Sequence, residues 1–225
     1  MDARPLRGRT VVVTRAAEQA GRLTRLLEDA GASVLEVPVT RVVEAADGGA
    51  ALRSSLAGSP DLDWIVVTSP NGVDALVRAA GGRVPPVPVA VVGPGTAEAL
   101  AAAGGRAALV PERFVAEGLL EAFPDPPSGG GRVLLAQAEA ARPVLAEGLR
   151  ARGWMVQSVV AYRTVVAAPP AHLVRAAALA DAITFTAGSG VGAYLDAAGV
   201  EAVPAVVVCI GPVTAGTAST PAASR

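Results

Sequence analysis

Short apolar runs alternate with amphipathic segments along most of the chain. The runs have the length of strands and include residues 11–13, 65–67, 89–92 and 206–210. Between them, apolar residues recur with helical spacing, as in Leu23, Leu26 and Leu27, with Gly31 placed where such a helix would end. Apolar strands that alternate with helices are typical of parallel β-α-β units, whose strands are covered on both faces by helices. The pattern therefore predicts an α/β fold.

An internal repeat extends this prediction to the architecture. Each copy contains a strand, a turn with Gly and the start of a helix, as in DWIVVTSPNGVDAL and DAITFTAGSGVGAYL. The matching pairs are 63–76 with 181–195, 89–97 with 206–215 and, more weakly, 8–39 with 131–164. A repeat of this kind predicts two doubly wound parallel-sheet domains of similar topology.

Two further segments connect the domains in this interpretation. Residues 38–45 and 160–167 alternate apolar and polar positions, as half-buried strands do. If they pair antiparallel, residues 1–38 and 168–225 form a discontinuous domain 1, residues 44–159 form an inserted domain 2, and 39–43 with 160–167 form a two-stranded linker. Narrow links make domains mobile, and a cleft between the domains is the expected ligand site.

Composition excludes several classes of function. Hydrophobic residues make up 52% of the chain, but no run approaches the length of about 20 needed to span a membrane. The chain contains no lysine, which removes Schiff-base chemistry and the lysine of a P-loop, and one histidine and one cysteine cannot build a structural zinc site. A net charge of -1 and 3% aromatic residues do not suit a nucleic-acid binder. No export signal is recognisable, so we expect a cytoplasmic protein. We also expect a monomer that binds no metal, organic cofactor, nucleic acid or membrane.

The turns that follow the strands indicate what this chain binds. They begin at Thr14, Thr68, Gly93, Thr186 and Gly211. Such turns at the carboxyl ends of parallel strands present free backbone N–H groups and a positive helix end, which favour anions. Their Ser, Thr and Asn side chains would serve equally well as helix caps, and a dinucleotide site fits poorly because the third glycine of its fingerprint is absent. Five turns facing one cleft predict a ligand with several carboxylates or phosphates.

These motifs together resemble the uroporphyrinogen-III synthase family. The resemblance rests on VVVTRAAEQA, WIVVTSPNGVDAL, VVGPGTAEAL, VVAYRTV, ITFTAGSGV and CIGPVTAGTA, and it spans residues 6–218. It implies two α/β domains joined by a two-stranded ladder and the linear tetrapyrrole hydroxymethylbilane as the substrate. The implied reaction is a cofactor-free cyclisation with inversion of ring D and loss of water, in the biosynthesis of tetrapyrroles such as heme, siroheme and cobalamin.

The resemblance also implies roles for particular residues. Tyr162, in the VVAYRTV connector, is the expected proton donor. The residues expected to contact the substrate are Thr14, Arg15, Thr68, Ser69, Asn71, Gly93, Thr96, Thr186, Ser189, Gly211 and Thr214. Arginines that could pair with further carboxylates are Arg41, Arg113, Arg142 and Arg163.

One departure from the repeat leaves a second interpretation open. The first copy continues after VGPGTA with a helix, a strand at 107–110 and another helix, whereas the second copy ends within ten residues in STPAASR, which we expect to be disordered. The C-terminal domain of a shortened family member would lack a strand and a helix. A non-catalytic or regulatory module that keeps the fold is therefore the alternative, and a hinged solute-binding protein is a third possibility that the absent export signal disfavours.

Overall fold

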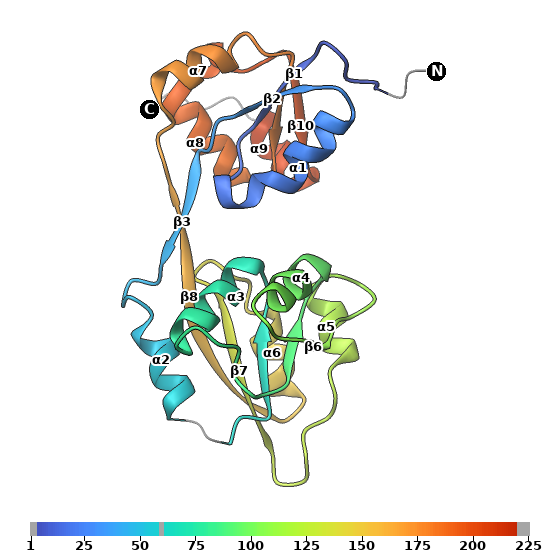
Figure 1. The fold of residues 1–225 in the computed structure, drawn as a ribbon, viewed down its shortest axis with the longest axis vertical. Helices are drawn as coiled ribbons and strands as arrows, with labels where there is room; N and C mark the ends of the chain where they lie inside the picture. Colours follow the sequence, from blue (N-terminus) through green and yellow to red (C-terminus); the bar gives the residue numbers. More distant parts are fainter. Residues whose placement is uncertain (1–3, 59–60, 220–225) are drawn as a thin grey trace. The chain divides into compact units, whose positions relative to one another are not determined.

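The chain folds into two compact α/β units. A computed structural model describes residues 4–58 and 61–219 (Figure 1). Unit 1 contains residues 1–42 and 165–225, and unit 2 contains residues 43–164. The predicted tail 219–225 lies outside the described residues except for Ser219. Among the described residues, no helix is long and apolar enough to cross a membrane.

Unit 1 is built on a four-stranded parallel sheet. Its strands have the order β10-β9-β1-β2, with bounds β1 Thr10–Val13, β2 Ser33–Glu36, β9 Ala182–Phe185 and β10 Val206–Cys209. The helices are α1 Ala17–Asp29, α7 Ala171–Ala177, α8 Gly188–Ala198 and α9 Pro212–Ser219, with a short 3-10 helix at Val200–Ala202. Strands β9 and β10 come from the C-terminal part of the chain, so unit 1 is discontinuous.

Unit 2 is built on a six-stranded sheet of order β3-β8-β7-β4-β5-β6. Its strands are β3 Thr40–Glu44, β4 Trp64–Val67, β5 Val89–Val91, β6 Ala107–Leu109, β7 Gly131–Ala138 and β8 Trp154–Val166. Its helices are α2 Ala50–Ala57, α3 Pro70–Ala79, α4 Pro94–Ala102, α5 Ala116–Ala122 and α6 Val144–Ala151. The pairs β8-β7, β7-β4, β4-β5 and β5-β6 are parallel.

The two sheets confirm the repeat inferred from the sequence. The order β10-β9-β1-β2 in unit 1 corresponds to β5-β4-β7-β8 in unit 2. Equivalent aspartates directly precede β9 and β4. Asp181 accepts a hydrogen bond from the backbone N–H of Thr10 at 2.8 Å, and Asp63 accepts one from the backbone N–H of Arg132 at 2.7 Å. Each bond ties the start of one strand to its neighbour. The α/β fold with two parallel-rich sheets is thus confirmed.

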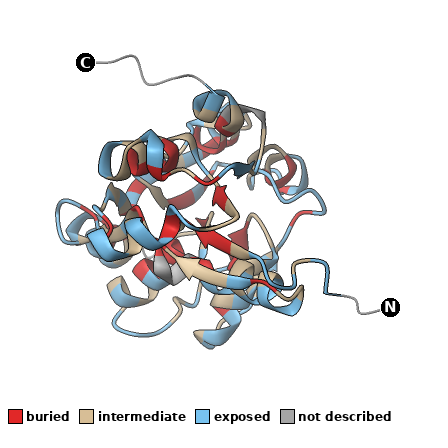
Figure 2. Cartoon of the chain, turned by 90° about the horizontal axis from the view of Figure 1, so that it is seen from above, coloured by how far each residue is buried: buried red, intermediate tan, exposed pale blue. Residues whose placement is uncertain are grey.

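Each unit has a separate hydrophobic core between its sheet and its helices. In unit 2, Phe123 packs against Trp64 and Trp154, with ring centroids 5.2 and 5.5 Å apart. In unit 1, Phe185 packs edge-on against Tyr194. Figure 2 shows the buried strands surrounded by helices whose outer faces are exposed.

The three leucines that follow helical spacing in the first helix are not all buried. Leu23 and Leu27 are half-buried, but Leu26 is 59% exposed. Helix α1 packs on β1 and β2, and β2 is the last strand of its sheet. An edge strand offers a narrow surface, so it covers only part of the apolar stripe.

The connecting segments are strands, as the alternating pattern predicted, but one is longer than expected. β8 is a single strand of 13 residues that includes both the last strand of the repeat and the predicted connector. The backbone carbonyl of Val39 accepts a hydrogen bond from the backbone N–H of Ala167, and the carbonyl of Glu44 accepts one from the side chain of Arg163. The start of one segment therefore contacts the end of the other, as in an antiparallel pair. The boundary between the units falls within β3 and β8, so Tyr162 belongs to unit 2.

Candidate active site

The predicted site residues of unit 2 gather at the carboxyl ends of its parallel strands. Thr68 and Ser69 follow β4, and Gly93 follows β5. Tyr162 lies in β8 opposite Ala138, the last residue of β7, after a shift in register. Because β4, β7 and β8 are consecutive in the sheet, these residues lie along the side of unit 2 where its parallel strands end. This side is called the edge of unit 2 below.

A hydrogen bond joins two of these residues across 93 positions of sequence. The Ser69 hydroxyl donates to the phenol oxygen of Tyr162 at 3.0 Å. The same Ser69 oxygen accepts from the backbone N–H of Gly72 at 3.1 Å and so caps α3. The backbone carbonyl of Tyr162 accepts from Glu139 at 3.0 Å, which holds this part of β8 to the end of β7. Since the phenol oxygen already accepts a hydrogen bond from Ser69, its own proton can be donated to a ligand.

Asn71 is a second polar residue at this edge, and its amide nitrogen lacks a described hydrogen-bond partner. It lies in the first turn of α3, next to Ser69, and only 8% of its surface is exposed. Its amide nitrogen has no hydrogen-bond partner in the described part of the chain. A buried polar group without a partner costs free energy, so an acceptor that reached this amide would be bound favourably.

Two glycines allow close approach at the same edge. A Cβ atom on Gly72 would lie 2.7 Å from a methyl carbon of Val67, which explains why the turn from β4 into α3 has no side chain there. A Cβ atom on Gly93 would lie 3.4 Å from Cβ of Phe114. Phe114 is 58% exposed, whereas the other two Phe residues of the chain, Phe123 and Phe185, are buried. Phe114 lies in the loop between β6 and α5 and is not among the contacts expected from the sequence.

Unit 1 carries the remaining predicted contacts at the carboxyl ends of its own strands. Thr14 is 4% exposed, and its hydroxyl donates to the carbonyl of Thr184 at 2.7 Å. Thr214, in the first turn of α9, is also buried. The others are half-buried or exposed, namely Arg15, Thr186, Ser189 and Gly211. The hydroxyl of Thr14 is thus used within the sheet, whereas Ser189 is exposed.

The arginines named from the sequence mostly have partners already. Arg113 pairs with Glu121, Arg142 pairs with Glu117 at 3.2 Å, and the side chain of Arg163 donates to the backbone carbonyl of Glu44. These pairs are exposed, where an ion pair contributes little and is easily exchanged. Arg41 is exposed on β3. The pKa of the Glu117 carboxyl is lowered mainly by a hydrogen bond from its own backbone N–H. The hydrogen bond from Arg142 lowers this pKa further.

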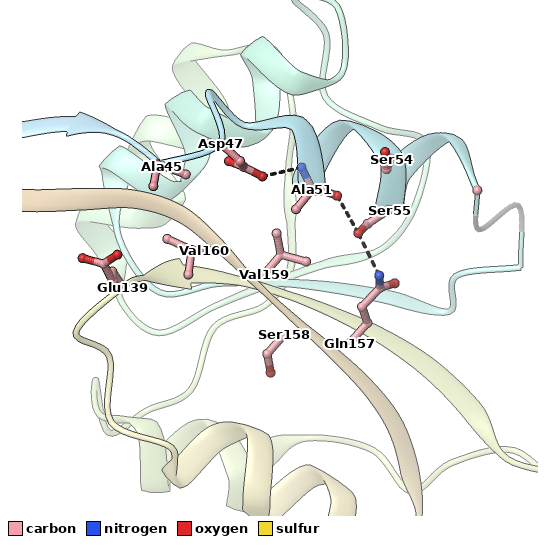
Figure 3. Close-up of a pocket in the computed structure, with 12 residues that line it drawn as sticks. Ala45, Asp47, Ala51, Ser54, Ser55, Glu139, Gln157, Ser158, Val159 and Val160 are labelled. Atoms are coloured by element: carbon pink, nitrogen blue, oxygen red, sulfur yellow. Dashed lines mark hydrogen bonds between the residues drawn. The ribbon is translucent and has the colours of Figure 1, made fainter.

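A separate cavity of about 620 Å³ lies between α2 and β8 of unit 2 (Figure 3). At one end, the Gln157 amide donates to the Ser55 hydroxyl at 2.9 Å. Asp47 accepts from the backbone N–H of Ala51, the main cause of the lowered pKa of its carboxyl, and thereby holds the start of α2. Glu139 is a second carboxylate of the lining. The described residues that line this cavity include two carboxylates, and none of them is an arginine or a predicted site residue.

No group of three or more His, Cys, Asp or Glu side chains within 4–58 and 61–219 is arranged to hold a metal ion. The groups gathered at the edge of unit 2 are hydroxyl, phenol, amide and backbone N–H groups. These groups donate hydrogen bonds to anions and can transfer a proton from the phenol.

Comparison with known proteins gives a consistent result. Residues 21–221 match the protein family described as uroporphyrinogen-III synthase HemD. The chain is 35% identical over 170 residues to a uroporphyrinogen-III synthase from Synechococcus elongatus; the match covers 73% of this chain and 64% of that protein. The chain therefore spans somewhat less than two thirds of the length of this relative.

Two solved structures share the fold. One is a mutant uroporphyrinogen III synthase from Thermus thermophilus, with a TM-score of 0.56, 23% identity and coverage of 93% of this chain and 88% of that one. The other is the uroporphyrinogen-III synthetase from Helicobacter pylori, with a TM-score of 0.60, 17% identity and coverage of 92% and 86%. At these identities the structures support the two-domain α/β fold alone.

Proposed function

This chain belongs to the uroporphyrinogen-III synthase family, and we propose that it catalyses the cyclisation of hydroxymethylbilane in tetrapyrrole biosynthesis. The enzyme class is that of a hydro-lyase, since water leaves as the ring closes. The observation that carries the proposal is the hydrogen bond from Ser69 to Tyr162, because it leaves a phenol proton available at the edge where the anion-binding turns lie. The proposed catalyst is made of protein groups alone.

The reaction requires few protein groups. The hydroxymethyl oxygen of ring A leaves as water, and the resulting electrophilic azafulvene is attacked by the substituted carbon of ring D. The spiro intermediate then fragments and closes again with ring D inverted. The pyrroles supply the electrons, so the protein must protonate the leaving hydroxyl and hold the two ends of the substrate together. Tyr162 is our proton donor, and Ser69 orients its phenol.

The substrate carries eight carboxylates, which fits the predicted contacts. In unit 2 these are Thr68, Ser69, Asn71, Gly93 and Thr96, and in unit 1 they are Thr14, Arg15, Thr186, Ser189, Gly211 and Thr214. Backbone N–H groups at the starts of α3, α4, α8 and α9 add donors with a favourable helix dipole. One chain supplies every group assigned here, so the activity requires no second copy.

Phe114 extends the proposed contacts with an apolar surface beside Gly93. A flat pyrrole can stack on an exposed ring, so Phe114→Ala should raise KM several-fold with a smaller effect on kcat. Phe123→Leu is unsuitable as a control because Phe123 is buried in the core. Exposed Leu179 in unit 1 gives a better one, since Leu179→Ala also removes an exposed apolar side chain. An unchanged KM for Phe114→Ala would exclude the stacking role.

The test of the function is the isomer that forms. The protein is incubated with freshly generated hydroxymethylbilane, and the type I and type III uroporphyrinogens are separated after oxidation. Without enzyme the substrate closes to type I, so type III above the protein-free control shows the activity. Type I alone would contradict catalysis. Product binding without turnover would instead favour the non-catalytic module that keeps the fold.

A further inference from the structure

Two arginines flank the groups gathered at the edge of unit 2. Arg113 is in the loop between β6 and α5, and Arg142 is in the loop between β7 and α6. β6 and β7 belong to the parallel part of the sheet, so both loops lie on the same side as the turns that follow β4 and β5. Arg113 directly precedes Phe114, the proposed stacking residue. Both arginines are therefore on the side of unit 2 where the proposed ligand binds.

The fold fixes the backbone at both arginines. A Cβ atom on Gly118 would collide with the backbone carbonyl of Arg113, so α5 approaches this loop closely because it has a glycine there. After β7, the backbone N–H of Ala141 donates to the carbonyl of Ala138 at 3.1 Å and closes a turn directly before Arg142. The side chains of the two arginines are 60% and 68% exposed. A change of partner therefore requires movement of the side chains alone.

Two glutamates of α5 hold these arginines. Arg142 pairs with Glu117 at 3.2 Å, and Arg113 pairs with Glu121. The glutamates are four residues apart, so their side chains lie on the same face of the helix. The pKa of Glu117 is lowered by its own backbone N–H, then by Arg142 and further by the charge of Arg113, so both arginines are near this carboxyl. We call these four side chains the α5 cluster, and their charges sum to zero.

The ion pairs of the α5 cluster are open to exchange. The side chains of Glu117 and Glu121 are 46% and 65% exposed. Water screens such a pair, which shifts an equilibrium by at most about five-fold. A carboxylate of a ligand has the same chemistry as the glutamate side chain, so it can replace Glu117 or Glu121 on the guanidinium group. A ligand with many carboxylates gains most from this exchange, because its other carboxylates hold it in place.

We propose that Arg113 and Arg142 bind carboxylates of the substrate, and that Glu117 and Glu121 hold these arginines until the substrate arrives. This inference rests on the proposed function, because it takes hydroxymethylbilane with its eight carboxylates as the ligand. Each glutamate competes with the substrate for a guanidinium group. Loss of a glutamate should therefore strengthen substrate binding, whereas loss of an arginine should weaken it. The arginines set the affinity and leave the proton transfer to Tyr162.

The values of KM and kcat for type III product test the proposal. Arg142→Gln and Arg113→Gln should each raise KM about three- to ten-fold with kcat unchanged, and Arg142→Lys should recover part of this loss. Glu117→Gln should lower KM about two- to five-fold. In the Arg142→Gln background, Glu117→Gln should have little further effect, because the guanidinium group that it would release is gone.

Two matched controls separate this exchange from a general effect of charge. Arg106→Gln removes an exposed arginine directly before β6, at the opposite end of the strand that leads to Arg113, and should leave KM unchanged. Glu112→Gln removes an exposed carboxylate of the same loop, which pairs with neither arginine in the described structure. It should change KM by less than about two-fold. If Glu112→Gln lowers KM as much as Glu117→Gln, the effect is one of overall charge and the proposal is wrong.

Binding of uroporphyrin III, the oxidised product, gives a readout that needs no turnover. It keeps the eight carboxylates, and its fluorescence reports the dissociation constant. This constant should rise in Arg142→Gln and fall in Glu117→Gln. Unchanged dissociation constants in both variants would overturn the inference, and type III formation by the unsubstituted chain would still support the proposed function. The expected changes in binding without type III product would support the exchange at the arginines and overturn the catalysis instead.

Discussion

The contact between Ser69 and Tyr162 supports a quantitative prediction about stability and turnover. Tyr162→Phe removes the acceptor of one hydrogen bond and should lower the free energy of unfolding by about 0.5 to 1.5 kcal/mol. Ser69→Ala removes the same bond and also the cap of α3, which together should cost about 1 to 3 kcal/mol. Because both changes remove the shared bond, the double variant should be about 1 kcal/mol more stable than the sum of the two losses predicts.

Turnover should follow a different pattern. Tyr162→Phe should slow turnover about 10- to 10,000-fold, the range for loss of a general acid. Ser69→Ala leaves the phenol in place but unoriented, and the loss of one hydrogen bond of about 1 kcal/mol predicts a fall of about five-fold. In the Tyr162→Phe background, Ser69→Ala should have little further effect on turnover, because no phenol remains to orient.

Type III product formation at saturating substrate measures these effects, and urea unfolding measures the stabilities. Ser69→Thr keeps the hydroxyl and should retain most of the activity. Tyr194→Phe removes the other phenol hydroxyl of the chain, so it should lower the stability of unit 1 but leave turnover of the folded protein unchanged. If Ser69→Ala lowers turnover by the same factor with and without Tyr162, Ser69 does not act through the phenol. Unchanged turnover in Tyr162→Phe would remove Tyr162 from the mechanism.

Three further predictions concern the fold. Gly72→Ala should destabilise unit 2 by about 1 to 2 kcal/mol in urea unfolding, because its Cβ would press on Val67, whereas Gly95→Ala, with open space at its Cβ, should not. The hydrogen bonds from the backbone N–H of Thr10 and then from Arg9 lower the pKa of Asp181 from its usual value of 3.8. The ionised carboxyl therefore stabilises the folded chain above pH 3.8, and this stabilisation is lost as the pH falls further and the carboxyl is protonated. The acid unfolding curve of Asp181→Asn should lose that part of the pH dependence. Tyr194→Phe should lower the stability of unit 1 by about 1 to 3 kcal/mol in thermal unfolding, since it leaves a buried carbonyl without its donor, and an unchanged Tm would contradict this.

The local pattern of the sequence was sufficient to predict the elements and their repetition. Strands such as 65–67 are short apolar runs between turns, and the helices after β4, β5, β9 and β10 begin at Pro or Gly residues. These signals depend on neighbours within a few residues, and the duplication showed the same signals twice. The β-α-β rule then predicted parallel sheets, and the structure and the fold of the family confirm them.

Only the tertiary structure could decide which side chains meet and which surfaces remain open. The bond between Ser69 and Tyr162 joins residues 93 positions apart, and Tyr162 pairs with the end of β7 only after a shift in register. The exposure of Leu26 depends on how wide a surface the edge strand β2 offers. Apolar runs encode the tendency to be buried, but burial itself is a property of the partners that the folded chain brings to each strand.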